Sequence, residues 1–151
     1  MMTNPAGFLY DPDPDHPGWL TWEFKDPTRV NALLGKVSVR QEPDGRVRMR
    51  AFPDRSHSNL GDKIHGGALL GYIDVALFAT SRTHGLIDAG TAVTLDLATQ
   101  FIGAADYDRE LDIVGEVLRA TRRLIFIRGL VEQGDALIAS FSGTIRRPSA
   151  P

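Results

Sequence analysis

Residues 68–83 constrain the fold more than any other segment, because they are apolar around almost the whole circumference of a helix. One set of residues follows the helical spacing and a second set fills much of the remaining surface: Ala68, Leu69, Tyr72, Ile73, Ala76, Leu77 and Thr80, then Leu70, Val75, Phe78 and Ala79. A helix that is apolar on nearly every side is normally buried. His84-Gly85 is expected to end it. The rest of the chain must therefore surround one buried helix.

Segments with the two-residue period of a β-strand lie on both sides of this helix. Residues 36–51 hold two alternating runs around the turn Pro43-Asp44-Gly45, the pattern of a β-hairpin with one solvated face. Four further extended segments follow the helix, at residues 91–102, 110–120, 123–131 and 136–147. Because helices and strands do not alternate along the chain, we expect an α+β fold in which one antiparallel sheet wraps around one helix.

The N-terminal part of the chain has a different character. Residues 1–18 are rich in Pro, Asp and Gly, which predicts irregular structure. Residues 19–24 (WLTWEF) are either a strand or an apolar anchor, and Trp19 and Trp22 are candidates to cover a sheet edge or a subunit seam. We therefore divide the chain into an N-terminal extension at residues 1–30, a main domain at 31–147 and a tail at 148–151.

A short helix is predicted at the junction between the extension and the main domain. Asp26 can cap its N-terminus, and Pro27 suits a first helical turn. Gly35 is expected to end it.

Composition narrows the functional classes. The chain has 151 residues, which suits one domain, and it has no cysteine, which excludes disulfides, thiolate metal sites and a cysteine nucleophile. Seventeen Lys and Arg against nineteen Asp and Glu give a net charge of −2, so no global bias toward nucleic acid or an anionic membrane exists. Neither a secretory signal nor a membrane-spanning run is visible. We expect a cytoplasmic protein without nucleic-acid or membrane partners.

Asp74 is the most informative polar residue, because it lies between Ile73 and Val75 in the middle of the apolar helix. No basic residue stands three or four positions away on the same helix to pair with it. Burying an unpaired carboxylate costs several kcal/mol, so it persists mainly where the group has a function or a partner elsewhere. Asp74 is therefore a candidate catalytic carboxylate; the alternative is a structural Asp that bonds a loop amide or faces solvent.

The sequence His65-Gly66-Gly67 opens the same helix. Its first backbone amides lack partners within the helix and lie at the positive end of the helix dipole, so they can bind an oxyanion. Asn59 precedes this motif in a polar loop, where it can hold a carbonyl or a water, or stabilise a turn. Asp74 lies about 13 Å along the axis from His65, so one helix cannot bring both to one point. This separation predicts a symmetric dimer with composite sites.

Other charged residues favour structural interpretations. Arg46, Arg48 and Arg50 alternate with apolar residues, which is typical of the solvated face of a strand. The remaining histidines, His16, His57 and His84, are interpreted as surface residues, and no metal site is expected.

Three segments together resemble the hotdog-fold acyl-CoA thioesterases of the phenylacetic acid degradation (PaaI-like) type. They are residues 59–74 (NLGDKIHGGALLGYID), 92–97 (AVTLDL) and 141–144 (FSGT). The resemblance covers roughly residues 31–147. It implies a five- or six-stranded antiparallel sheet around a central helix, and homodimers that often pair again into tetramers.

The resemblance also implies roles for individual residues. Asp74 would be the general base or nucleophile, and the Gly66 amide would polarise the thioester carbonyl. Asn59 and His65 would lie beside that carbonyl and the attacking water. Thr94 falls where family members often carry a Ser or Thr that orients this water from the partner chain. Strict alternation with Val93, Leu95, Leu97 and Phe101 nevertheless puts Thr94 on the opposite face of its strand from these apolar residues.

The implied substrate is an acyl-CoA, and no cofactor is expected beyond the coenzyme A of the substrate. Arg122 and Arg123 at a predicted turn are candidates to hold its phosphates, as is Arg82, although each also suits a solvated position. Tyr72, Leu77 or Phe78 are candidates to line the acyl pocket. Two other functions stay open: a hydratase or dehydratase of acyl thioesters using His65 with Asp74, and a non-catalytic acyl-CoA-binding module.

Overall fold

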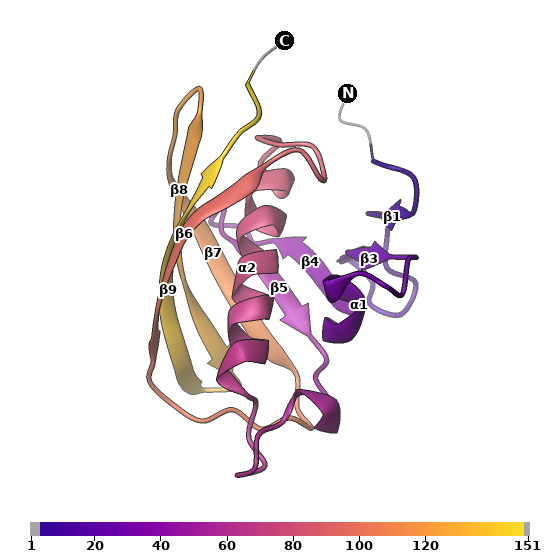
Figure 1. Cartoon of the computed structure of the whole chain (residues 1–151), viewed down its shortest axis with the longest axis vertical. Coiled ribbons are helices and arrows are strands. Elements are labelled where there is room, and N and C mark those ends of the chain that lie inside the picture. The colour runs from indigo at the N-terminus through magenta and orange to yellow at the C-terminus, as the bar shows by residue number, and fades with distance from the viewer. Residues whose placement is uncertain (1–3, 150–151) are drawn as a thin grey trace.

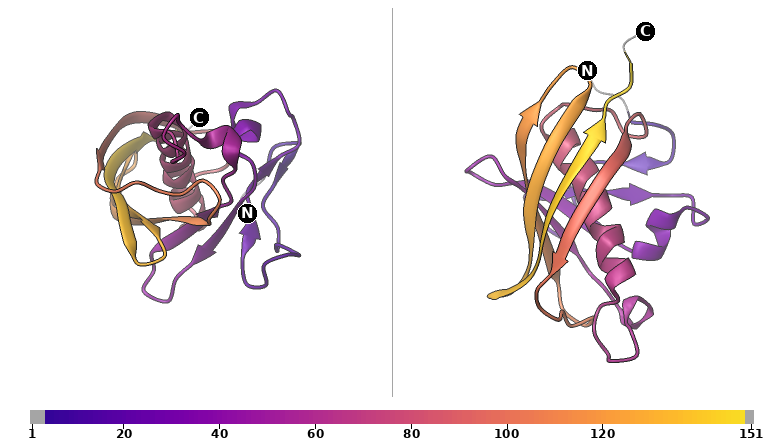
Figure 2. Two further views of the ribbon diagram at one scale, coloured as in Figure 1. Left: turned by 90° about the horizontal axis from the view of Figure 1, so that it is seen from below. Right: turned by 60° about the vertical axis from the view of Figure 1, so that its left-hand side comes forward.

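The structure, a computed structural model, describes residues 4–149. One long helix, α2 (Gly66–Thr83), lies in the concave face of a seven-stranded antiparallel sheet (Figure 1). The strand order is β2-β4-β5-β7-β8-β9-β6. Viewed along the helix, the sheet curls around α2 (Figure 2, left). The expected α+β architecture, the hotdog fold, is confirmed, and the N-terminal extension adds β2 to its sheet.

The strands of the main domain follow the sequence periodicities. The hairpin before α2 consists of β4 (Val37–Gln41) and β5 (Val47–Ala51). After α2 come β6 (Val93–Phe101), β7 (Leu111–Ala120), β8 (Leu124–Gln133) and β9 (Ala136–Arg146). Within the described residues, β6 pairs with β9 alone and forms one edge of the sheet.

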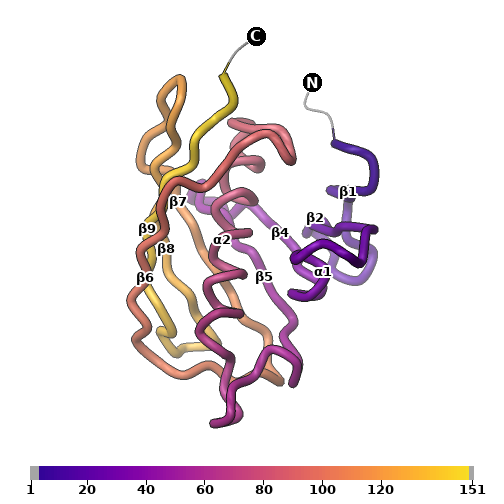
Figure 3. The backbone as a smooth tube through the Cα atoms, viewed as in Figure 1, coloured from indigo at the N-terminus to yellow at the C-terminus, as the bar shows by residue number. Residues whose placement is uncertain are grey.

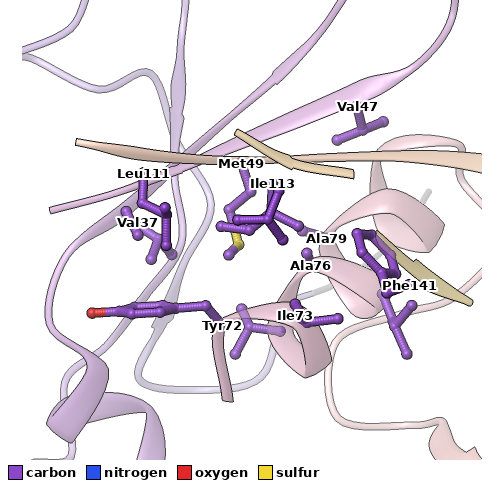
Figure 4. Close-up of a cluster of buried hydrophobic side chains, with 14 of the residues drawn as sticks. Val37, Val47, Met49, Tyr72, Ile73, Ala76, Ala79, Leu111, Ile113 and Phe141 are labelled. Carbon is purple, nitrogen blue, oxygen red and sulfur yellow. The ribbon is translucent and has the colours of Figure 1, made fainter. Parts of the chain in front are cut away.

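The core lies between α2 and the concave face of the sheet (Figure 4). Tyr72, Ile73 and Leu77 are fully buried there, and side chains of this size each contribute roughly 1.5–3 kcal/mol when buried. The helix approaches β9 so closely that a Cβ at Gly143 would lie 2.6 Å from Leu77 Cδ1. Tyr72 and Leu77, two of the candidates for the acyl pocket, are therefore core residues.

The N-terminal extension contains three two-residue strands: β1 (Phe8–Leu9), β2 (Leu20–Thr21) and β3 (Glu23–Phe24). β2 covers the edge of β4, and β1 pairs with β3 beside it. In the backbone trace these strands and α1 lie on the flank of α2 away from β6 and β9 (Figure 3). The segment 19–24 is thus both strand and anchor, since the buried Trp22 joins the core cluster.

Two kinds of contact hold the extension on the sheet. The guanidinium groups of Arg40 and Arg50 lie over the Trp19 ring, 4.4 and 4.9 Å from its centre. The buried carboxylate of Asp13 accepts hydrogen bonds from Ser38 Oγ at 2.5 Å and Lys36 Nζ at 3.1 Å. Burial alone would raise the pKa of Asp13, but hydrogen bonds from Ser38, the Asp15 amide, Lys36 and His16 outweigh it and hold this pKa well below its usual range.

The short helix α1 (Val30–Leu34) begins later than predicted. The Asp26 carboxylate accepts hydrogen bonds from the amide and hydroxyl of Thr28, which makes a local turn, and Arg29 occupies the N-cap without a side-chain hydrogen bond. The helix ends at Gly35 as expected, with φ of 73°. The prediction that Asp26 caps this helix and that Pro27 lies in its first turn is therefore wrong.

Two buried side chains hold the C-terminal end of α1. Tyr72 Oη donates to the Leu34 carbonyl at 3.0 Å, and His57 Nε2 lies 2.6 Å from the Leu33 carbonyl. His57 Nδ1 accepts the Asp54 amide at 3.0 Å, so Nε2 carries the proton and donates. The interpretation of His57 as a surface residue is wrong. Although His57 belongs to a polar loop, its side chain is buried and binds the C-terminal end of α1.

Arg48 and Arg50 lie on the half-exposed face of β5, opposite its buried apolar residues, as the alternation predicts. Arg48 and Arg50 both form ion pairs with Asp112 on β7, at 2.9 and 2.8 Å.

Within residues 4–149, no helix is long and apolar enough to cross a membrane.

Candidate active site

Asp74 lies halfway along α2 and is half-buried beside the start of β6. Thr94 Oγ1 donates a hydrogen bond to Asp74 Oδ1 at 2.7 Å. A hydrogen bond of this kind stabilises a carboxylate and fixes its orientation, leaving the second oxygen available to another donor. The contact is made within one chain, whereas the resemblance implied that Thr94 would act from the partner chain.

A β-bulge brings Thr94 to Asp74. Thr94 pairs with Ile145 of β9, but the next pair along the strand is Asp96 with Thr144, so Leu95 is an extra residue. This insertion reverses the alternation. Thr94 consequently shares the helix-facing side with Leu97, while Val93 and Leu95 are 46% and 53% exposed. Thr94 therefore lies opposite Val93 and Leu95, as strict alternation predicts, but the prediction is wrong for Leu97, which follows the bulge.

An apolar pocket of about 450 Å³ adjoins the Asp74 carboxylate. Among the described residues that line it, the polar side-chain groups are the Asp74 carboxylate, the Asn31 amide and the Trp22 indole N–H. The remaining lining side chains include Phe24, Val30, Leu34, Val75, Phe78 and Ile87. Phe78 is thus the one predicted acyl-pocket candidate that borders this space. We call Asp74, Thr94 and this pocket the carboxylate half-site.

The N-terminus of α2 provides a different set of groups. His65 is the N-cap residue, and its Nδ1 accepts the Gly67 amide at 2.8 Å. A Cβ at Gly67 would lie 3.0 Å from that nitrogen, so the glycine makes room for the capping imidazole. Nothing in residues 4–149 accepts a hydrogen bond from the Gly66 amide. Gly66 therefore presents an unpaired donor at the positive end of the helix.

Asn59 lies in the loop before this helix. Its Oδ1 accepts the amides of Gly61 and Lys63 at 2.9 and 3.1 Å. The side-chain carbonyl thus stabilises a turn, and the NH₂ group of Asn59 can donate a hydrogen bond to a ligand. We call Asn59, His65 and Gly66 the amide half-site.

The two half-sites of one chain are separated along α2. Gly66 and Asp74 are eight residues apart, which is about 12 Å along the axis. An amide at one position and a carboxylate at the other cannot contact the same carbonyl group. The geometry therefore agrees with the expectation that the groups are not used together within one chain.

The edge strand β6 is long and carries exposed apolar side chains. Val93, Leu95, Phe101 and the adjoining Ile102 are 46–55% exposed. A nine-residue edge strand with unpaired backbone groups and exposed apolar side chains is a surface suited to pairing with another strand.

Arg122 and Arg123 occupy the β7–β8 turn and are exposed. Together with Arg147 they border a depression of about 620 Å³ near the end of α2. Arg82 differs: it is buried, donates to Asn4 Oδ1 at 2.8 Å and lies 3.5 Å from Asp88. The interpretation of Arg82 as a solvated charge at a helix end is wrong, because the extension covers it.

The comparisons place the chain in a family. Residues 61–139 match the model of the thioesterase superfamily. The chain belongs to this superfamily. The match spans the loop of the amide half-site after Asn59, the whole of α2 and most of the strands that follow. A search of curated proteins finds no match.

Solved structures of the same fold support the assignment. A conserved protein, PA5202, from Pseudomonas aeruginosa is 31% identical, with a TM-score of 0.67, over 80% of this chain and 94% of that one. A point mutant of the phenylacetic acid degradation protein PaaI from Thermus thermophilus is 25% identical, with a TM-score of 0.65, over 81% and 99%. A hypothetical thioesterase from Streptococcus pneumoniae, solved with coenzyme A, is 20% identical, with a TM-score of 0.65, over 76% and 93%, and shows the fold alone. The resemblance to PaaI-type hotdog thioesterases is confirmed.

Proposed function

We propose that this thioesterase-superfamily protein hydrolyses acyl-CoA thioesters to the free acid and coenzyme A. The observation that carries this proposal is the pairing of Asp74 with Thr94 beside an apolar pocket. An oriented carboxylate can activate a water, and an apolar cavity next to it can hold an acyl group.

The catalytic site would combine the two half-sites of a homodimer. Antiparallel pairing of two β6 edges would continue the sheet from one chain into the next and cover exposed apolar side chains of both. Each site would then take Asp74 and Thr94 from one chain and Gly66, His65 and Asn59 from its partner. Pairing of such dimers into tetramers is compatible with this arrangement.

The reaction can be written with these groups. Asp74 accepts a proton from water while the water oxygen attacks the thioester carbonyl carbon. The Gly66 amide donates to the carbonyl oxygen as it becomes an oxyanion, and the Asn59 NH₂ group is a candidate second donor. The carbon–sulfur bond then breaks, and the thiolate of coenzyme A takes up the proton. Direct attack by the Asp74 carboxylate would instead form an anhydride that water hydrolyses.

His65 is assigned a positioning role at the helix N-terminus, because its Nδ1 is already engaged by the Gly67 amide. In the alternative function, His65 and Asp74 would act together as the acid–base pair of a hydratase. Crotonyl-CoA hydration tests that alternative directly. Arg122 and Arg123 are proposed to attract the phosphates of coenzyme A.

Release of free thiol from acyl-CoAs tests the proposed function. Asp74→Asn is expected to lower kcat at least about a hundredfold, the scale for removal of a catalytic base. Asp135→Asn, in the exposed β8–β9 turn, is the matched control and is expected to retain wild-type activity. Hydrolysis that survives Asp74→Asn would contradict the assignment of the base. A folded wild type that binds acyl-CoA without turnover would favour a binding module.

A further inference from the structure

The N-terminal extension and α1 make one wall of the pocket beside Asp74. Trp22 and Phe24 come from the extension, and Val30 and Leu34 come from α1. All four lie outside residues 61–139, the region that matches the superfamily model. The opposite wall consists of α2 residues and the connection at residues 87–92. The pocket is therefore built partly from a segment that lies outside the matched region.

This wall is held in place by contacts from several directions. The Trp22 amide donates to the Val37 carbonyl at 3.2 Å, and its ring meets Phe8 edge-on with the centres 4.9 Å apart. Phe24 pairs with Phe8 across β1 and β3, with ring centres 5.2 Å apart. Leu34 lies against Gly71, where a Cβ would come within 3.2 Å of its methyl carbon. Such contacts make the wall an ordered part of the fold.

The lining of the pocket beside Asp74 disfavours a negatively charged acyl group. Over the residues that the structure describes, it contains neither lysine nor arginine, and its one ionisable group is the carboxylate of Asp74. An acyl group that ends in a second carboxylate would lose hydration and face Asp74 without a compensating cation. An uncharged apolar acyl group would instead gain from leaving water at the aromatic and aliphatic wall.

We infer that the segment from Trp22 to Leu34 forms the acyl-binding wall of this enzyme, with Phe24 setting how much uncharged apolar bulk is accepted. The inference rests on the proposed function, because it takes the group attached to the scissile carbonyl to occupy the pocket beside Asp74. Phe24 is half-buried, so its ring can be removed with less damage to the core than that of Trp22.

The test compares a phenylalanine of the wall with one on β8. Phe24→Ala removes a lining side chain, whereas Phe126→Ala removes a 37% exposed side chain that is not in the lining and does not support the wall. The measured quantity is kcat/KM for butanoyl-, hexanoyl- and decanoyl-CoA, with succinyl-CoA as the charged substrate. Ala89→Leu adds bulk from the opposite wall and does not depend on the folding of the extension.

Phe24→Ala is expected to raise the decanoyl-to-butanoyl ratio of kcat/KM at least about tenfold, and Ala89→Leu is expected to lower it, since single methylenes change specificity by about 10–200-fold. Phe126→Ala is expected to leave the ratio near that of the wild type. Succinyl-CoA should be hydrolysed at least about a hundredfold less efficiently than butanoyl-CoA. Equal ratios in Phe24→Ala and Phe126→Ala, together with no effect of Ala89→Leu, would overturn the inference.

A binding measurement separates failure of the wall from failure of the proposed hydrolysis. Trp22 borders the pocket, whereas Trp19 lies away from it, beside two arginines. In the variant Trp19→Phe, tryptophan fluorescence therefore reports on Trp22 alone. The probes are S-hexyl-CoA, a thioether that cannot be hydrolysed, and coenzyme A. Tighter binding of S-hexyl-CoA with a change in fluorescence, weakened by Phe24→Ala and not by Phe126→Ala, supports the wall even where no thioester is hydrolysed. Hydrolysis without such a preference contradicts it.

Discussion

The start and the middle of α2 carry complementary groups in contrasting surroundings. At Gly66 there is a backbone donor at the first residue of the helix, next to the capping His65 and close to the Phe101 ring. At Asp74 there is an oriented carboxylate with an apolar pocket, yet the backbone amides there are engaged within the helix. The first region has a free amide donor but no carboxylate, and the second has a carboxylate but no free amide. Because about 12 Å of helix separates the two groups, both can serve one reaction only if two chains cooperate.

The largest effect beyond that of Asp74→Asn is expected from Gly66→Pro. Proline removes the amide donor but suits the first position of a helix, and His65 already has the extended conformation that precedes proline well. Removal of an oxyanion donor is expected to lower kcat about 10²–10³-fold, with little change in the melting temperature. Gly66→Ala keeps the amide, and its Cβ would meet Phe101 at an ordinary 3.6 Å, so it is the matched control. Equal activities of the two variants would remove Gly66 from the mechanism.

A smaller effect is expected at the other half-site from Thr94→Ala. Loss of a hydrogen bond to a carboxylate is worth about 1.5–3 kcal/mol, or roughly 10–100-fold in kcat if the bond persists in the transition state. Thr94→Ser keeps the hydroxyl and should restore most of the activity. Thr94→Val gives a second readout, because it keeps the branched shape and loses only the hydroxyl, and it should be as impaired as Thr94→Ala. Wild-type activity in Thr94→Val would show that Thr94 only packs against Asp74.

The smallest effect on activity is expected from Asp13→Asn, which lies away from both half-sites. Its folded-state pKa is lowered, so its stabilising contribution is present above the pKa of the unfolded chain and is lost as pH falls below about 4. The variant should lose about 1–3 kcal/mol of unfolding free energy at neutral pH and show a weaker decline of stability between about pH 4 and pH 2. Thermal melts across this range, with Asp15→Asn as the exposed control, test the assignment. A decline as steep as in the wild type would contradict it.

The main features of the fold could be predicted because periodicity records which face of each element is buried. The helix over residues 68–83 and the strands around it appear in the structure within a few residues of their predicted ends. The carboxylate in that helix and the glycines that open it were equally visible, since each breaks a local rule of residue placement. Their roles in catalysis stay predictions.

The features that sequence could not provide depend on contacts between distant segments. Strict alternation wrongly put Thr94 and Leu97 on opposite faces, because a single extra residue, Leu95, reverses the strand face without any mark in composition. His57 was misjudged because its partner is a carbonyl of α1, 24 residues earlier. The pocket wall at Trp22 and Phe24 arises from packing of the extension against α2, which no local pattern describes.

Restoration of activity in mixed dimers tests the central claim most directly. Asp74→Asn and Gly66→Pro chains carrying different tags are coexpressed, and dimers containing one of each are purified. Such a dimer would hold one site with both defects and one intact site, made of Gly66 from the first chain and Asp74 from the second. The composite site predicts about half of the wild-type activity per dimer, against almost none for either parent. Activity no higher than that of the parents would show that the two half-sites do not meet across the dimer.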